Sequence, residues 1–296
     1  MKLYHASLTL KVFLKYHKLF PEKKLHALRT FGDLNHEMKA FCKTHRDKIG
    51  SLILDSGTWT LNNAKADLKH RLTCPNYINY LMEFKDHFDF YFNFDSDFLG
   101  DENDTNYQNQ ILLEEQGLKP VPVVHDIEGD EIEHYIDRGY PIVALGSSQI
   151  KNVDTLDSVM NKFKGTDTKI HLFGNARFKF ISNFPIYSCD STAWAQRGKW
   201  GFIYYWNPEN DGIDKMDKIY MEEYLDVNKK HKFTYSSYEF REELDKYLYK
   251  TLGVTEGDLL GPNGAYYKQL VNLHYYVQLE EIINQIHREK GFWTAE

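Results

Sequence analysis

Two aspartates of this chain lie in local sequences that suit chemistry on a glycosidic bond. Asp55 in LILDSGTW and Asp190 in IYSCDSTAW each end an apolar run, and each is followed by a serine. In a double displacement, one carboxylate captures the sugar carbon of a nucleoside covalently, while a second handles the proton on the leaving or entering base. Two such aspartates in one pocket would suffice. The pattern leaves open that each aspartate only caps the turn after its strand.

The sequence around these aspartates predicts repeated strand–helix units. Between residues 50 and 206, short apolar, β-branched or aromatic runs alternate with longer segments of helical period. We expect eight parallel strands closed into a (β/α)8 TIM barrel; an open doubly wound sheet is the alternative, but no GxGxxG follows an early strand. The predicted strands are Leu3–Leu8, Ser51–Leu54, Phe88–Phe94, Val121–Val124, Ile142–Leu145, Lys169–Leu172, Pro185–Tyr187 and Phe202–Tyr205.

Polar or small residues follow six of the predicted strands. In a barrel the carboxyl ends of the strands form one mouth, where active sites are built. We therefore expect a single site to which these strands all contribute. The residues concerned are Asp55, Asp95, His125, Gly146, Gly174 and Asp190.

The pattern changes after Tyr205. Residues 207 to 232 are charged and aromatic, and two helices are expected at Ser237–Leu252 and Ala265–Lys290. No linker rich in Pro, Gly or Ser divides the chain. We therefore predict a single TIM-barrel domain over residues 1–296, with 207–296 as its C-terminal helical completion.

The charge balance limits how the chain can bind nucleic acid. Its 43 acidic and 36 basic residues give a formal net charge of −7 at pH 7, the wrong sign for coating nucleic acid through bulk electrostatics. Contacts to phosphate must then be local. The candidates are Arg177 with Lys179 and Arg197 with Lys199, and the alternative is that these are ordinary solvated charges.

Cysteine usage and hydropathy place the protein in a broad class. Cys42, Cys74 and Cys189 lie far apart and form no CxxC pair, which argues against a disulfide framework and against a zinc ribbon. The apolar stretch Leu8–Phe20 is interrupted by lysines and has no cleavage site of a signal peptide. We expect a soluble cytoplasmic protein, in the host cytoplasm if phage-encoded, with no membrane partner and no metal.

Seven segments of the chain together resemble the tRNA-guanine transglycosylase superfamily, in the same order and with the same spacing. Each motif is short, but together they span roughly residues 50 to 285. The matching segments are ILDSGTW at Ile53–Trp59, FDSD at Phe94–Asp97, VVHD at Val123–Asp126, ALGSSQ at Ala144–Gln149, HLFGN at His171–Asn175, YSCDSTAW at Tyr187–Trp194 and NLHYYVQLEEI at Asn272–Ile282.

The chain also departs from that family. The family's zinc site needs clustered cysteines and a late histidine, yet no cysteine follows Cys189 and Val271 stands at the histidine position. Its Asp-Ser-Gly-Gly motif is altered at Thr58, and His125 replaces a glutamine. In DSTAW and PVPVVH the chain looks closer to the DpdA-type DNA-guanine transglycosylases of phages and bacteria, which place 7-cyano-7-deazaguanine or a derivative in DNA.

The resemblance implies a role for each catalytic aspartate. Asp190 would attack C1′ of the target nucleoside and expel guanine. Asp55 would act as general base toward the incoming 7-deazaguanine. No cofactor is implied.

The resemblance also implies the residues that bind substrate. Asp95 would accept hydrogen bonds from N1–H and the amine of the purine, and His125 would donate to its carbonyl. Gly146 would let the backbone approach the base, and Ser56 and Trp59 would hold the aspartates or stack on the target. The expected partners are DNA, opened locally, and the 7-deazaguanine base. An accessory protein or a homodimer is possible.

Three other functions remain open at this point. The first is a transglycosylase acting on tRNA, which the missing zinc site disfavours. The second is a catalytically silent barrel that binds nucleic acid or protein, against which the retained aspartates argue. The third is a metal-dependent hydrolase using Asp55, Asp95, His125 and Asp190, disfavoured because no HxH motif is present.

Overall fold

The computed structural model describes residues 1–32, 36–58, 72–96, 103–146, 149–221 and 233–292. Their contacts group into two compact units. The first comprises Met1–Ala6, Lys24–Ser191 and Ile286–Glu296, and the second comprises Ser7–Lys23 and Thr192–Gln285. That the whole chain forms a single domain stays a prediction.

The first unit is built on an all-parallel, eight-stranded sheet in the order β4-β3-β2-β1-β8-β7-β6-β5. The sheet is curled, and a parallel bridge between Phe92 and Val121 joins the ends of its two edge strands. This architecture is TIM-barrel-like. Its strands are β1 Lys2–Ala6, β2 Leu25–Thr30, β3 Ile49–Asp55, β4 Phe90–Tyr91, β5 Val123–Val124, β6 Ile142–Leu145, β7 Lys169–Leu172 and β8 Ser188–Ser191.

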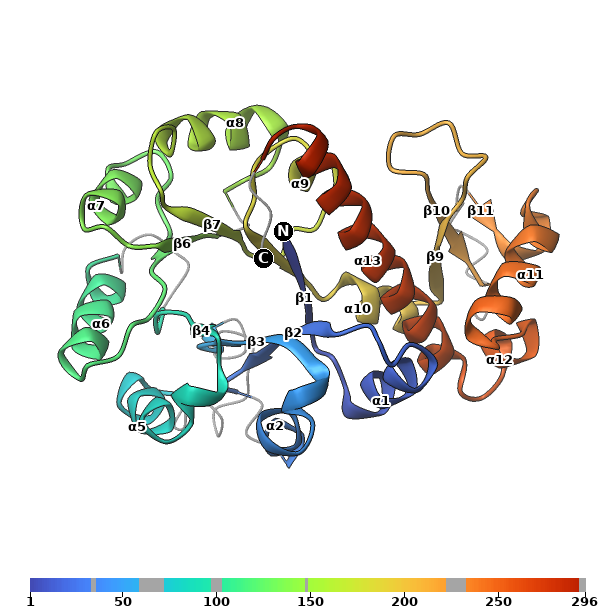
Figure 1. The fold of residues 1–296 in the computed structure, drawn as a ribbon, viewed down its shortest axis with the longest axis horizontal. Helices are drawn as coiled ribbons and strands as arrows, with labels where there is room; N and C mark the ends of the chain where they lie inside the picture. Colours follow the sequence, from blue (N-terminus) through green and yellow to red (C-terminus); the bar gives the residue numbers. More distant parts are fainter. Residues whose placement is uncertain (33–35, 59–71, 97–102, 147–148, 222–232, 293–296) are drawn as a thin grey trace. The chain divides into compact units, whose positions relative to one another are not determined.

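Helices connect these strands, as a parallel sheet requires. Figure 1 shows the strands in the middle of this unit with the helices around them. The helical elements are α2 His36–Lys39, η1 Ala40–Thr44, η2 Arg46–Lys48, α5 Cys74–Phe84, η3 Lys85–His87, α6 Asn103–Glu115, α7 Glu131–Asp137, α8 Val153–Lys162 and α9 Phe178–Ile181.

Side chains fill the inside of the curled sheet. Because side chains alternate along a strand, every second residue of each strand points inward. Tyr4, Ile53, Phe92 and Ala144, from four different strands or strand ends, are buried there in one apolar cluster. The interior is therefore a packed core, and a functional site is expected at an end of the strands.

The second unit contains the remaining elements. It holds a three-stranded sheet in the order β11-β10-β9, with β9 and β10 antiparallel. None of the described helices in either unit is long and apolar enough to cross a membrane. The elements are α1 Leu10–Leu19, α10 Ala193–Lys199, β9 Phe202–Trp206, β10 Met216–Tyr220, β11 Phe233–Thr234, η4 Tyr235–Ser237, α11 Arg241–Leu252, α12 Glu256–Leu260 and, before Ile286, α13 Gly264–Glu289.

The structure differs from the predicted strands at three places, one of which is the strand expected at Pro185–Tyr187 and observed at Ser188–Ser191. Phe202–Tyr205 was expected in the barrel but lies in β9 of the small sheet, since an apolar run does not specify which sheet it joins. The eighth strand of the large sheet is instead β2, Leu25–Thr30. It was not predicted, because His26 and Arg29 interrupt its apolar run. Residues 207–296, expected as a C-terminal helical completion, hold α11, α12 and α13 but also the strands β10 and β11.

Asn272 of α13 satisfies the open edge of β9. Its side-chain oxygen accepts from Tyr204 N (2.7 Å), and its Nδ2 donates to Phe202 O (3.1 Å) and Trp194 O (3.0 Å). The residue is fully buried. This one side chain thus bonds two backbone groups of β9 that no described strand pairs.

We expect Asn272→Ala to destabilise the protein by at least about 3 kcal/mol, because each orphaned buried backbone group costs about 1–3 kcal/mol. Urea unfolding followed by circular dichroism measures the change. Lys246→Ala, at an exposed position of α11, is the control and should unfold like wild type. An Asn272→Ala midpoint equal to that of the control would contradict the role given to this side chain.

Candidate active site

The predicted site residues of the first unit lie at the carboxyl ends of its strands. Asp55 is the last residue of β3 and pairs in register with Thr30, while Asp190 in β8 pairs with Tyr4. Asp95, His125 and Gly146 follow β4, β5 and β6. The strand order therefore brings residues far apart in sequence to the same edge of one sheet.

Asp55 sits in a sharp turn that supplies hydrogen bonds to its carboxylate. The backbone N–H of Gly57 donates to Oδ2 (3.2 Å), and the backbone of Ser56 also donates to the carboxylate. Gly57 has a φ of +90°, and a Cβ there would lie 2.9 Å from Thr30 Oγ1. Glycine is therefore required for this turn.

Burial, together with the negative charges of Asp95 and Asp190, raises the pKa of Asp55 to about 7, and the two backbone hydrogen bonds oppose this rise. A carboxyl group that titrates near neutral pH can both give and take a proton there. The charges of both Asp95 and Asp190 thus act on Asp55. This is the first sign that they form one site.

Asp95 pairs with His125. Oδ1 of Asp95 lies 3.3 Å from His125 Nε2 and 3.4 Å from Asn93 Nδ2, and all three side chains are buried. The hydroxyl of Thr58 donates to the backbone oxygen of Asp95, which ties the turn after β3 to the segment after β4. Burial raises the pKa of Asp95, and the contact with His125 opposes this.

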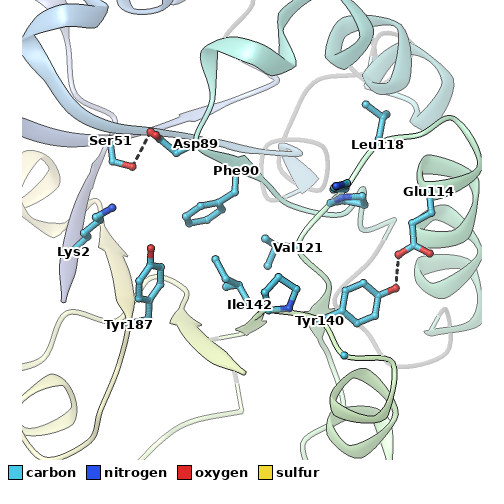
Figure 2. Close-up of a pocket in the computed structure, with 14 residues that line it drawn as sticks. Lys2, Ser51, Asp89, Phe90, Glu114, Leu118, Val121, Tyr140, Ile142 and Tyr187 are labelled. Atoms are coloured by element: carbon cyan, nitrogen blue, oxygen red, sulfur yellow. Dashed lines mark hydrogen bonds between the residues drawn. The ribbon is translucent and has the colours of Figure 1, made fainter. Parts of the chain in front are cut away.

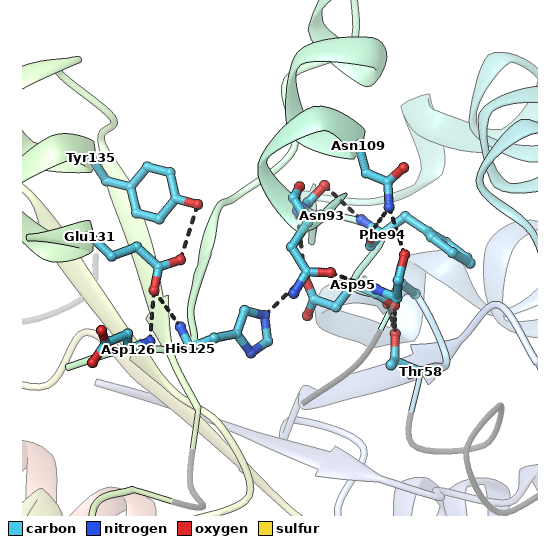
Figure 3. Close-up of polar contacts among 12 residues, drawn as sticks. Thr58, Asn93, Phe94, Asp95, Asn109, His125, Asp126, Glu131 and Tyr135 are labelled. Carbon is cyan, nitrogen blue, oxygen red and sulfur yellow. Dashed lines mark hydrogen bonds and ion pairs between the residues drawn. The ribbon is translucent and has the colours of Figure 1, made fainter. Parts of the chain in front are cut away.

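A partly buried carboxylate, that of Glu131, fixes the backbone that carries His125. Oε2 of Glu131, at the start of α7, accepts from the backbone N–H of His125 and of Asp126, both at 2.7 Å. Tyr135 donates to the other oxygen (3.3 Å), and the side chain of Gln149 bonds the His125 carbonyl. Figure 3 shows the ring of His125 directed toward Asp95, with Glu131 behind its backbone.

Asp190 is almost fully buried, with 6% of its surface exposed. Its Oδ1 accepts from the backbone N–H of Gly174 (2.7 Å) and lies 3.5 Å from His171 Nε2. Gly174 follows β7, the strand next to β8, so the neighbouring strand end supplies the donor. Asp190 is thus oriented by a group outside its own turn.

The other predicted substrate-binding residues are placed as follows. Gly146 donates to Val124 O (3.3 Å), and a Cβ at Gly146 would crowd that same carbonyl oxygen at 3.3 Å. Ser56 is buried, and its hydroxyl bonds that of Thr58 (3.0 Å), so it supports the Asp55 turn. Trp59 lies outside the described residues. Contact of these residues with a substrate stays a prediction.

The predicted phosphate-binding residues fall in both units. Arg177 and Lys179 lie at the start of α9, after the carboxyl end of β7, and both cations lie over the ring of Phe180. Arg197 and Lys199 belong to α10 of the second unit, where the Arg197 guanidinium lies 5.0 Å from the ring centre of Trp200. Contact of these cations with nucleic acid also stays a prediction.

The sequence reasoning missed three polar residues that support the site. His171 was quoted within HLFGN without a role, although strand alternation puts it on the inner face with Phe173. Glu131 could have been found from the sequence, because it is an acidic residue in the first turn of α7, where it can bond free backbone N–H groups. Asn93, in the apolar run before Asp95, gave no signal.

A cavity of about 600 Å³ lies at the opposite ends of the strands, near the first residues of β1, β4 and β6. Its acidic groups are already bonded: Asp89 Oδ2 accepts from Arg46, Ser51 and Leu52, and Glu114 accepts from Tyr140 and Arg138. Figure 2 shows two of these bonds beside the apolar side chains of the cavity. Because these carboxylates already bond other residues of the chain, the strand ends with Asp55, Asp95 and Asp190 are the better candidate site.

A search of protein-family models and of curated proteins finds no match to this chain. The function must therefore be inferred from the site's own residues. Among the residues that the structure describes, no group of three His, Cys, Asp or Glu side chains could hold a metal ion.

Asp55→Asn tests the burial of this carboxyl group. Between pH 3.8 and about 7 the folded protein keeps a proton on Asp55 that the unfolded chain has lost. Protonated Asp55 therefore makes its full contribution to the free energy of unfolding below pH 3.8, and this contribution is lost as the pH rises toward about 7. We expect Asp55→Asn to raise Tm at pH 8 by about 2–4 °C, as for about 1 kcal/mol, and to change it little at pH 4.

Differential scanning calorimetry across this pH range checks the prediction. Asp137→Asn, at an exposed position at the end of α7, is the matched control and should leave the pH dependence unchanged. If the curves for Asp55→Asn and wild type ran parallel from pH 4 to 8, Asp55 would not titrate near 7.

Proposed function

We propose that this protein is a transglycosylase that exchanges guanine in DNA for a 7-deazaguanine through a glycosyl ester on Asp190. The observation that carries the proposal is the pairing of a buried, oriented carboxylate, Asp190, with a second carboxyl group, Asp55, whose pKa is about 7. The TIM-barrel-like sheet supports it, because we take this sheet to be the (β/α)8 barrel of the transglycosylase superfamily.

In the first half of the reaction, Asp190 attacks C1′ of the target deoxyguanosine. The C1′–N9 bond breaks, its electron pair goes to the guanine, and protonated Asp55 supplies the proton that the leaving base needs. In the second half, Asp55 takes the proton from N9 of the incoming 7-deazaguanine. The nitrogen then bonds C1′, and Asp190 leaves as a carboxylate.

The charge on Asp190 couples these two halves. Repulsion by ionised Asp190 helps to keep Asp55 protonated in the free enzyme. When Asp190 becomes a neutral ester this repulsion ends, which favours loss of the proton from Asp55. When Asp190 is expelled its charge returns, and the proton affinity of Asp55 rises as it accepts the proton of the entering base.

The pair of Asp95 and His125 supports a guanine-like base as substrate. A carboxylate accepts from both N1–H and the exocyclic amine, a donor pair that adenine does not offer. With Asp95 accepting there, His125 is close enough to reach the carbonyl on the same edge of the purine. The bonds of Glu131 to the His125 backbone fix the position of this histidine.

DNA is the preferred nucleic acid, and tRNA is the second candidate. The target base must leave the duplex to reach buried Asp190, and Arg177 and Lys179 are exposed on the loop after β7 to hold phosphate nearby. The formal charge of −7 disfavours binding through the whole surface, so an accessory protein or a second copy of the chain would supply further contacts.

Mass spectrometry of nucleosides tests the proposal. DNA and tRNA are isolated from a host that makes 7-cyano-7-deazaguanine and expresses wild type, Asp190→Ala or the surface control Asp137→Ala. We expect a deoxy-7-deazaguanosine in DNA with wild type and with the control, and none with Asp190→Ala. Modified nucleoside in tRNA alone would establish the second candidate, and an active Asp190→Ala protein would refute the nucleophile.

The pH dependence of the two halves tests the role of Asp55. We expect kcat/KM for DNA, which reports the first half, to fall above pH about 7, because Asp55 must be protonated. kcat/KM for the free base should instead rise with pH to a plateau below 7, because Asp55 must be ionised and the neutral ester no longer repels it. Two profiles of the same shape would contradict this assignment.

A further inference from the structure

His171 is a buried polar residue that the mechanism above does not use. It lies in β7 with its side chain inside the curled sheet and is fully buried. Its ring centre is 4.8 Å from those of Phe92 and Phe173. An imidazole in such an aromatic interior needs polar partners for its nitrogens.

Each ring nitrogen of His171 has one polar neighbour on β8. Nδ1 lies 2.8 Å from the hydroxyl oxygen of Ser188, which pairs with His171 in register. Nε2 lies 3.5 Å from Oδ1 of Asp190, and among the described residues it is buried without a hydrogen-bond partner. Because Ser188 and Asp190 are two residues apart on one strand, both face the same side.

The direction of the hydrogen bond between Ser188 and Nδ1 is coupled to the tautomer of the ring, because a hydroxyl can donate or accept. If the Ser188 hydroxyl donates to Nδ1, the ring proton is on Nε2 and is directed at Asp190. At 3.5 Å this contact is long for a hydrogen bond. Catalytic hydrogen bonds are often long without substrate and shorten in the complex.

The two oxygens of Asp190 are therefore in different surroundings. Oδ1 accepts from Gly174 N–H at 2.7 Å and faces His171. Within the described part of the chain, Oδ2 accepts no hydrogen bond. A lone pair that makes no hydrogen bond is the better nucleophile, because no donor has to be removed before it attacks.

We propose that His171 is a positioning residue which, together with the N–H of Gly174, holds Oδ1 of Asp190 and leaves Oδ2 as the attacking atom. The inference rests on the proposed function. The bond from Oδ2 to C1′ forms as C1′–N9 breaks, and Oδ1 becomes the carbonyl oxygen of the ester. When C1′–Oδ2 breaks in the second half, the charge that returns to the carboxylate is shared with Oδ1, where both donors stabilise it.

Three variants separate this role from simple packing. His171→Phe keeps an aromatic ring in an aromatic interior but removes the donor. His171→Gln retains an N–H group near the position of Nε2. Ser188→Ala removes the partner that places the proton on Nε2, and leaves the ring in place.

The decisive measurement is single-turnover formation of the glycosyl ester, detected as a mass increase of the protein with a guanine-containing oligonucleotide and no incoming base. We expect His171→Phe to slow ester formation about 10- to 100-fold with unchanged KM for DNA, as for loss of one hydrogen bond to a charged group. His171→Gln should restore most of the rate, and Ser188→Ala should give an intermediate loss. Thermal unfolding of each variant shows whether it is folded.

NMR of the imidazole nitrogens in the wild-type protein gives a second test that needs no activity. We expect the Nε2–H form of His171, and conversion of part of it to the Nδ1–H form in Ser188→Ala. A wild-type protein that forms no ester would refute the proposed function, while this NMR test would still decide the tautomer. An active wild type with a folded His171→Phe that forms ester at the same rate, or an Nδ1–H ring, would overturn the inference.

Discussion

The burial of three carboxylates at the carboxyl edge of one parallel sheet is the constraint on which the rest of this site depends. Burial raises the pKa of Asp55 and of Asp95, and the charges of Asp95 and Asp190 add to the rise at Asp55. Each carboxylate is stabilised by a nearby donor group. Backbone N–H groups donate to Asp55, His125 faces Asp95, and the N–H of Gly174 donates to Asp190. The sharp turn at Gly57 and the glycine after β7, Gly174, place backbone N–H groups where they can donate to these carboxylates.

A second layer of buried polar groups holds these donors in place. Glu131 bonds two backbone N–H groups at the end of β5, and so positions the histidine that faces Asp95. Asn93 bonds the carbonyl of Asn106 and thereby links the end of β4 to α6. Such hydrogen bonds rigidify the residues that they join, since a buried polar group without a partner is costly. The positions of the carboxylates thus depend on hydrogen bonds between the strand ends and the surrounding helices α6 and α7.

The sequence was sufficient for the parallel architecture and for the residues at strand ends, but not for the partners across strands. β6 and β7 were predicted with the observed bounds, because their apolar runs are short and clearly bounded. β2 was missed because His26 and Arg29 interrupt its apolar pattern. The contact of His171 with Asp190 depends on the register between β7 and β8, which local sequence does not encode.

An exchange reaction needs two carboxyl groups in opposite protonation states that change in turn. Two identical aspartates in one pocket would compete for a single proton, as coupled groups do. The surroundings remove this symmetry: Asp55 is raised to a pKa of about 7 by burial and by its neighbours, whereas Asp190 receives a short backbone hydrogen bond at one oxygen. These different surroundings make Asp55 the group that holds a proton near neutral pH. In the reaction that we propose, the division between base and nucleophile follows from the environments of the two strand ends.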